Sequence, residues 1–156
     1  MHMEFKPVVF KVNNQEYGVD IGLVRGVEKL QNIVNVPNSN PDIRGIINLR
    51  GDVVPVYSFR HHFHLEEAEP TDDTKFIVVN IDGMSVALEV DAVEEIHDIE
   101  DCMIQDIPKI IKSEDTRFID KVVNFSGRLV LIIDIKNLLT EEESEDLQKM
   151  IEKISE

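Results

Sequence analysis

Three histidines are the residues whose clustering first suggests chemistry. His61, His62 and His64 lie close together in the sequence, and imidazole nitrogens bind zinc, copper, iron and nickel. No cysteine lies nearby and no HExxH pattern is present, and side chains one or two positions apart on a helix do not face each other. We therefore expect no metal ion here. The histidines should face solvent, with Phe59 and Phe63 facing the core.

The cysteine and the acidic residues do not form a catalytic pattern either. Cys102 is the only cysteine, so an intrachain disulfide is excluded and a reducing compartment is favoured. A nucleophilic cysteine needs a base and an orienting group, whereas lone cysteines usually only pack. The carboxylates near Cys102 lack the order of a calcium-binding loop and should form an exposed acidic loop. They are Glu94, Glu95, Asp98, Glu100 and Asp101.

Composition narrows the function classes further. The chain has 156 residues, of which 42% are hydrophobic, and a formal net charge of -15. This length fits one domain or two small subdomains. A surface so negative repels phosphate backbones and anionic lipids, so we expect no nucleic acid partner and no direct membrane insertion. Without a signal-peptide pattern, a membrane span or a nucleotide-binding motif, the sequence predicts a cytoplasmic protein that is not an enzyme and uses no cofactor.

The elements that would position functional residues occur twice. Residues 43–63 and 119–139 align without a gap, and each copy has the pattern of a strand, a glycine turn, a second strand and a short helical segment. Pro55 lies in the second strand of the first copy. It should occupy an edge, a bulge or a position whose nitrogen faces solvent, because proline cannot donate to a ladder. The shared turn residues are Asn48 and Gly51 in the first copy and Asn124 and Gly127 in the second.

A hairpin precedes each copy of this unit. Residues 8–21 and 76–90 each contain an apolar strand, a turn and an alternating strand, after which the apolar spacing changes from two to three. The change suggests a bend or bulge that turns the strand around a tight barrel. We therefore expect a mostly β chain that forms two small five-stranded barrels in tandem, with a binding groove between them.

The C-terminus carries the clearest helix signal. Thr140 as N-cap and Glu143 three residues later form a capping box, and the glutamates of the first turn favour the positive end of the helix dipole. The helix should span residues 141–154 and pack on the barrels or on a partner. Its apolar stripe consists of Leu147, Met150, Ile151 and Ile154.

Two motifs carry a resemblance to a known family. The first is the YGVDI segment at residues 17–21, followed by Val24 and Val27. The second is the segment at residues 43–56, which contains an Asn-Leu-Arg-Gly tetrapeptide and an internal proline. With these motifs the chain resembles the CheW family of chemotaxis coupling proteins over nearly all of its length.

The resemblance implies an adaptor function. Members of this family bridge the cytoplasmic tips of methyl-accepting chemoreceptors and the regulatory domain of the histidine kinase CheA, at receptor arrays on the inner face of the membrane. The resemblance also implies a single domain over residues 1–156, made of two intertwined SH3-like five-stranded β-barrel subdomains at roughly 8–70 and 75–139. Carried over by position, the partner-binding residues are Val24, Arg25, Val27, Gly45, Leu49 and Arg50.

One departure from the family affects Arg50. Members commonly have an acidic residue where this chain has Gly26. Arg50 should then pair with another carboxylate, Glu28 or Asp52, or point to solvent. Its guanidinium is either exposed on a turn or held in a semi-buried ion pair that shapes a partner site.

Two other functions stay open at this point. One alternative to the chemotaxis adaptor is a CheW-like scaffold of a non-motility signalling pathway, which would have the same fold and a different receptor. A small metal-binding β protein would instead use His61, His62 and His64 with nearby carboxylates.

Overall fold

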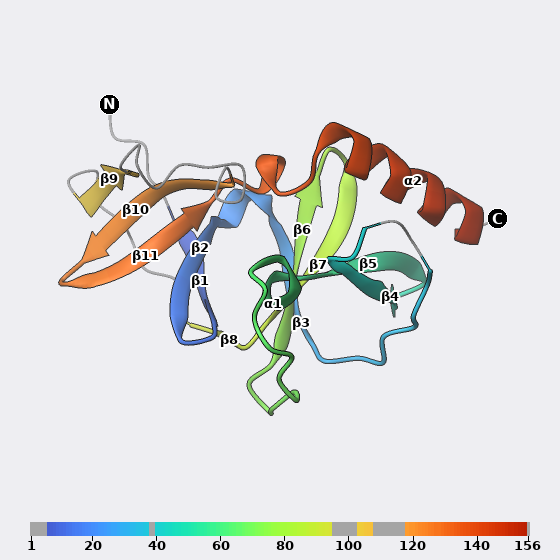
Figure 1. The fold of residues 1–156 in the computed structure, drawn as a ribbon, viewed down its shortest axis with the longest axis horizontal. Coiled ribbons are helices and arrows are strands. Elements are labelled where there is room, and N and C mark those ends of the chain that lie inside the picture. The colour runs from blue at the N-terminus through green and yellow to red at the C-terminus, as the bar shows by residue number, and fades with distance from the viewer. Residues whose placement is uncertain (1–5, 38–39, 95–102, 108–117, 156) are drawn as a thin grey trace.

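A computed structural model describes residues 6–37, 40–94, 103–107 and 118–155. Two mainly antiparallel sheets lie side by side, and a long helix lies along one end of the molecule next to the five-stranded sheet (Figure 1). The six-stranded sheet consists, in spatial order, of β8 (Ala92–Val93), β1 (Pro7–Val12), β2 (Gln15–Asp20), β11 (Arg128–Ile133), β10 (Ile119–Phe125) and β9 (Ile104–Asp106). The five-stranded sheet consists of β3 (Val24–Lys29), β6 (Lys75–Ile81), β7 (Met84–Val90), β5 (Asp52–Ser58) and β4 (Ile43–Leu49).

The helical elements are few. A short helix α1 (Phe59–His62) follows β5, and a 3-10 turn at Ile135–Asn137 follows β11 at the equivalent point of the second copy. The long helix α2 (Glu141–Ser155) ends the described chain. The predicted mostly β fold with a C-terminal helix is confirmed, with the difference that one sheet has six strands and neither is a closed barrel.

The repeated unit has the same hairpin geometry in both copies. Arg50 and Gly51 at the β4–β5 turn have positive φ angles of 53° and 91°, and Ser126 and Gly127 at the β10–β11 turn have 52° and 91°. Two consecutive positive φ angles make a type I′ turn, which matches the twist of the flanking strands. The side chain of Asn48 accepts a hydrogen bond from the Gly51 backbone N–H at 2.9 Å. Its counterpart Asn124 accepts from Gly127 at 3.1 Å, which explains why both copies keep the asparagine and the glycine.

Each hairpin pairs with the repeated unit of the other half of the chain. β2 runs parallel to β11 in one sheet, and β7 runs parallel to β5 in the other. Between β2 and β3 the chain passes through a 3-10 turn at Ile21–Leu23, and between β7 and β8 it bends at Asp91. The predicted bends are therefore present, and each carries the chain from one sheet into the other (Figure 1).

Pro55 lies on an interior strand, which excludes the edge among the three positions expected for it. β5 is hydrogen-bonded to β4 on one side and to β7 on the other, and Pro55 is buried. The parallel pairing with β7 begins only at Val56, opposite Ala87. In the other sheet the equivalent pairing begins one residue earlier, at Leu131 opposite Tyr17. The parallel pairing thus starts one residue later in this sheet, because proline has no N–H to donate to the neighbouring strand.

The main core lies between the two sheets. The largest cluster of buried apolar side chains among the described residues takes members from both, including Phe10 and Tyr17 of the six-stranded sheet and Tyr57 of the five-stranded sheet. Phe59 packs at 5.6 Å from the Phe10 ring and at 5.4 Å from the Tyr57 ring, measured between ring centroids. Each sheet also has a smaller apolar cluster made largely of its own strands. Neither sheet therefore buries enough apolar surface by itself.

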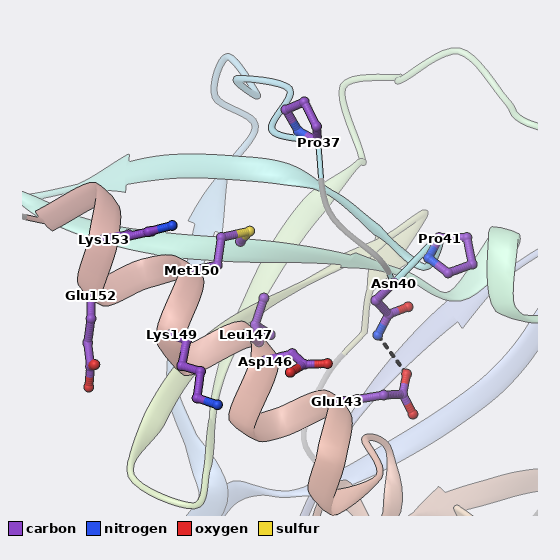
Figure 2. Close-up of a pocket in the computed structure, with 10 residues that line it drawn as sticks. All are labelled: Pro37, Asn40, Pro41, Glu143, Asp146, Leu147, Lys149, Met150, Glu152 and Lys153. Atoms are coloured by element: carbon purple, nitrogen blue, oxygen red, sulfur yellow. Dashed lines mark hydrogen bonds between the residues drawn. The ribbon is translucent and has the colours of Figure 1, made fainter.

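Helix α2 packs against this common core. Thr140 and Glu143 form the predicted capping box, with the Glu143 N–H donating to the Thr140 hydroxyl at 3.0 Å and the Thr140 N–H donating to Glu143 at 3.1 Å. Leu147 is buried in the central cluster, and Met150 packs on it. The Asn40 side chain donates to Glu143 at 2.7 Å, which ties the helix to the chain before β4 (Figure 2). Within the described ranges no helix is long and apolar enough to cross a membrane.

Replacement of Gly45 by alanine should destabilise the fold by about 1–3 kcal/mol, the usual cost of overpacking. An added Cβ would overlap the carbonyl oxygen of Val34, whose bridge to Ile46 covers β4, and would lie 2.9 Å from Cγ2 of Ile33. Urea unfolding measures the change. Gly26→Ala is the control, since a Cβ there meets only the Glu28 carboxylate at 3.6 Å. Equal stability of the two variants would contradict this account.

Candidate functional site

A groove runs beside β3, where the two sheets meet. β3 is an edge strand, hydrogen-bonded to β6 on one side only. The groove has a volume of about 480 Å³. One wall comes from β3 and the turn before it, and the other from β1 and β8. The residues that line this β3 groove are Val8, Ile21, Val24, Arg25, Gly26, Val27, Val93 and Glu94.

The β3 groove contains three of the residues expected to bind a partner. Val27 is 45% exposed and Ile21 is 41% exposed, while Val24 is half-buried and packs against the central core. Arg25 is exposed and donates to the Ser85 hydroxyl at 2.5 Å. Large apolar side chains that remain exposed beside a groove are typical of a surface that another protein covers.

The other three expected residues belong to β4 and its turn. Leu49 is half-buried against the small core of the five-stranded sheet, and Arg50 stands at the tip of the turn. Gly45 is buried under Val34, so it shapes the sheet and presents no surface. The structure therefore divides the six residues into a group in the β3 groove and a group on β4 that does not line it.

Arg50 pairs with Glu28, one of the two carboxylates expected. Arg50 Nη2 lies 2.8 Å from Glu28 Oε1. The arginine side chain is 77% exposed, however, whereas that of Glu28 is 20% exposed, so the expectation of a semi-buried arginine is wrong. Because Glu28 lies on β3, the ion pair joins the two opposite edges of the five-stranded sheet. An exposed pair of this kind contributes at most about 1 kcal/mol to stability.

His61 and His62 both hydrogen-bond to Asp42. Nδ1 of His61 lies 2.7 Å from Asp42 Oδ1, and Nδ1 of His62 lies 2.9 Å from Asp42 Oδ2. His62 is only 23% exposed and packs edge-on against Phe118 at 5.1 Å, so the expectation that it faces solvent is wrong. His61 and His64 are exposed as expected. Among the described residues no group of three His, Cys, Asp or Glu is arranged to hold a metal ion.

Asp42 has a shifted pKa. Burial alone would raise its pKa, but the hydrogen bonds from His62 and His61 and their positive charge outweigh burial and lower the pKa below the ordinary value of 3.8. Asp42 is also fixed by its backbone, since its N–H donates to Asn40 and its carbonyl accepts from Ser58. It therefore joins α1 to the start of β4.

Sequence reasoning missed the second wall of the β3 groove. Val93 and Glu94 occupy the positions that correspond to Val24 and Arg25 in the repeated hairpin. The repeat was the signal that would have identified them. Most of the acidic loop, from residue 95 to Asp101, and Cys102 lie outside the described residues.

A larger groove of about 870 Å³ lies between α2 and the chain around Pro41 (Figure 2). Leu147 and Met150 contribute apolar surface to it, while Lys149 and Glu152 contribute charges of opposite sign. None of the six expected residues lines this groove.

Residues 6–143 match the family model described as a CheW-like domain. The chain is 34% identical to the chemotaxis protein CheW of Bacillus subtilis, over 90% of each chain, and 31% identical to that of Rhizobium meliloti, over 88% of this chain and 89% of the relative. The structure is similar to the crystal structure of the scaffolding protein TtCheW from Thermoanaerobacter tengcongensis. That comparison has a TM-score of 0.77 and 34% identity and covers 84% of this chain and 89% of the other. Most of α2 lies beyond the family match.

Replacement of Asp42 by asparagine should reduce stability at about pH 5.5, and the loss should shrink as the pH falls. A pKa lowered by folding means that ionised Asp42 stabilises the fold above its ordinary pKa, and that this stabilisation disappears as the pH falls through the folded value. Urea unfolding of both proteins at several pH values between about pH 5.5 and pH 3 measures the difference. Asp52→Asn, at the exposed β4–β5 turn, is the control. A difference that stays constant over this range would contradict the prediction.

Proposed function

The chain belongs to the CheW-like domain family, and from this premise we propose that it couples chemoreceptors to the histidine kinase CheA. Members of the family are scaffold and adaptor proteins rather than enzymes, and the relatives named above are chemotaxis proteins. The family match over most of the chain is the observation that carries the proposal. An adaptor needs two separable surfaces, and the division of the six expected residues into two groups supports this requirement.

The β3 groove is the surface that we assign to the receptor. Its exposed Val27 and Ile21, with half-buried Val24 between them in the chain, suit the apolar face of an amphipathic helix. The cytoplasmic tip of a methyl-accepting chemoreceptor presents such helices. Contacts of modest affinity suffice here, because linked copies in an array strengthen one another.

The β4–β5 turn is the surface that we assign to the regulatory domain of CheA. Leu49 and Arg50 offer a half-buried apolar side chain beside an exposed guanidinium, a combination common at protein interfaces. Arginine at an interface supplies directional hydrogen bonds to a carboxylate or carbonyl. The Glu28 pair holds the guanidinium in place before the partner arrives.

We also propose one domain of two intertwined subdomains, located in the cytoplasm and recruited to receptor arrays at the inner face of the membrane. The exchange of strands between the sheets supports the intertwined arrangement, because residues from both halves of the chain contribute to each sheet. The boundary between the two halves of the chain lies at residues 70–75, and each subdomain contains strands from both sides of it.

The whole proposal is tested by measuring binding of the purified chain to two probes: the isolated regulatory domain of CheA and a cytoplasmic fragment of a chemoreceptor from the same organism. Binding to both, with a ternary complex detected by size-exclusion chromatography, is the expected result. Binding to neither probe would refute the adaptor function.

Replacement of Val27 by aspartate should weaken receptor binding at least tenfold, roughly 1.4 kcal/mol, because the interface would bury an unpaired carboxylate. Isothermal titration calorimetry with the receptor fragment measures the change. Leu129→Asp is the matched control, since Leu129 is 54% exposed on β11 outside the β3 groove. Equal losses in both variants would show that the added charge, and not the groove, is responsible.

Replacement of Arg50 by alanine should leave the chain folded, with a loss of less than about 1 kcal/mol of stability, because the pair with Glu28 is exposed. Binding to the CheA regulatory domain should fall, while receptor binding should persist. Urea unfolding and calorimetry with each probe measure these effects. Normal binding to the kinase domain would remove Arg50 from this surface, and an unfolded variant would show that its role is structural.

A further inference from the structure

The two walls of the β3 groove carry equivalent residues of opposite charge. Val24 and Arg25 on β3 correspond, through the repeated hairpin, to Val93 and Glu94 at β8. All four line the groove. The groove therefore has an apolar pair between its walls, a cation on one side and a carboxylate on the other.

These two charges differ in whether the protein already neutralises them. Glu94 lies 3.0 Å from Lys11 Nζ and 3.0 Å from Arg128 Nη2. Arg128 also pairs with Glu16 and lowers the pKa of that carboxyl group. Glu94 thus belongs to an ion-pair network within the protein and needs no cation from a binding partner.

Arg25 has no such network. Its guanidinium donates to the Ser85 hydroxyl, a neutral group, and among the described residues no carboxylate pairs with it. Ser85 is itself the repeat counterpart of Glu16. The position that supplies a carboxylate in one half therefore supplies only a hydroxyl in the other, so within the described part of the chain the arginine keeps its charge without a carboxylate and keeps its remaining donors.

We propose that Arg25 is a charge-specificity determinant of this groove, and that the occupant helix presents a carboxylate to the β3 wall beside its apolar face. The identity of the occupant, a receptor helix, rests on the proposed function; the chemistry of the contact rests on the groove. A chain of net charge -15 repels an acidic partner at long range. Salt screens that repulsion beyond a Debye length of about 8 Å. The charge of Arg25 at the contact itself therefore determines which face of the helix binds.

The asymmetry also orients the occupant. A helix with its carboxylate on one flank can satisfy Arg25 in one direction only, because reversal places that carboxylate against the Glu94 wall. There Lys11 and Arg128 already pair with Glu94, so the carboxylate gains no equivalent partner. The groove would then select both an apolar stripe and the side on which its acidic neighbour lies.

The test measures binding of the full chain to the chemoreceptor cytoplasmic fragment. Arg25→Glu should weaken binding at least tenfold, roughly 1.4 kcal/mol, because it places two carboxylates together. Arg25→Lys should bind within a few-fold of the native chain. Lys29→Glu is the matched control, since Lys29 is exposed on the same strand, lies outside the groove and undergoes the same change of charge; its binding should change by less than twofold.

A charge exchange identifies the contact directly. Acidic residues at the fragment's tip are replaced one at a time by lysine, and one of these variants should restore binding to Arg25→Glu while it weakens binding to the native chain. Failure of every exchange, or equal losses for Arg25→Glu and Lys29→Glu, overturns the proposal. The proposal is also overturned if Arg25→Glu changes the oligomeric state of the chain in the absence of the fragment. That result would show that the groove binds a second copy of the chain.

The native chain separates this failure from failure of the proposed function. If the native chain binds neither the receptor fragment nor the CheA domain, the adaptor function itself is wrong and the occupant assigned here is wrong with it. If the native chain binds the fragment and Arg25→Glu binds it equally well, only the role of Arg25 is refuted. Binding to the CheA domain should be unchanged in Arg25→Glu, which shows that the variant is folded.

Discussion

The central apolar core forms only when the two sheets come together. Each sheet has only a small cluster of its own, whereas the largest cluster takes side chains from both sheets and from α2. Burial of apolar surface is the dominant favourable term in folding, so neither half can reach its structure alone. The exchange of hairpins reinforces this dependence, because each half of the chain supplies strands to both sheets.

The same exchange creates the candidate partner surfaces. When the chain leaves β2 and enters β3, an edge strand comes to lie beside β1 and β8 of the other sheet, and the β3 groove forms at this junction. At the other end of β3, Glu28 reaches the β4–β5 turn and holds Arg50. One crossing strand thus takes part in both candidate surfaces.

Stability depends on buried side chains more than on surface charges. Buried aromatic and aliphatic side chains hold the sheets together, while exposed ion pairs such as Glu28–Arg50 contribute little to folding. The fold is shared with a solved structure at 34% identity. Gly26 has no side chain to offer Arg50, and the neighbouring Glu28 supplies the carboxylate.

Sequence reasoning predicted the repeat, the hairpins with their asparagine–glycine turns, the capped C-terminal helix and the family resemblance, because these depend on local periodicity and on backbone conformations that few residues adopt. It also named two carboxylates as possible partners of Arg50, with exposure to solvent as the alternative. The folded chain was needed to show which half of the chain each hairpin pairs with, that Pro55 lies inside a sheet, that His62 is packed against Phe118, and that Val93 and Glu94 face Val24 and Arg25 across a groove. Those outcomes depend on contacts between residues far apart in the chain, and a pattern of local spacing contains no information on which distant strands meet.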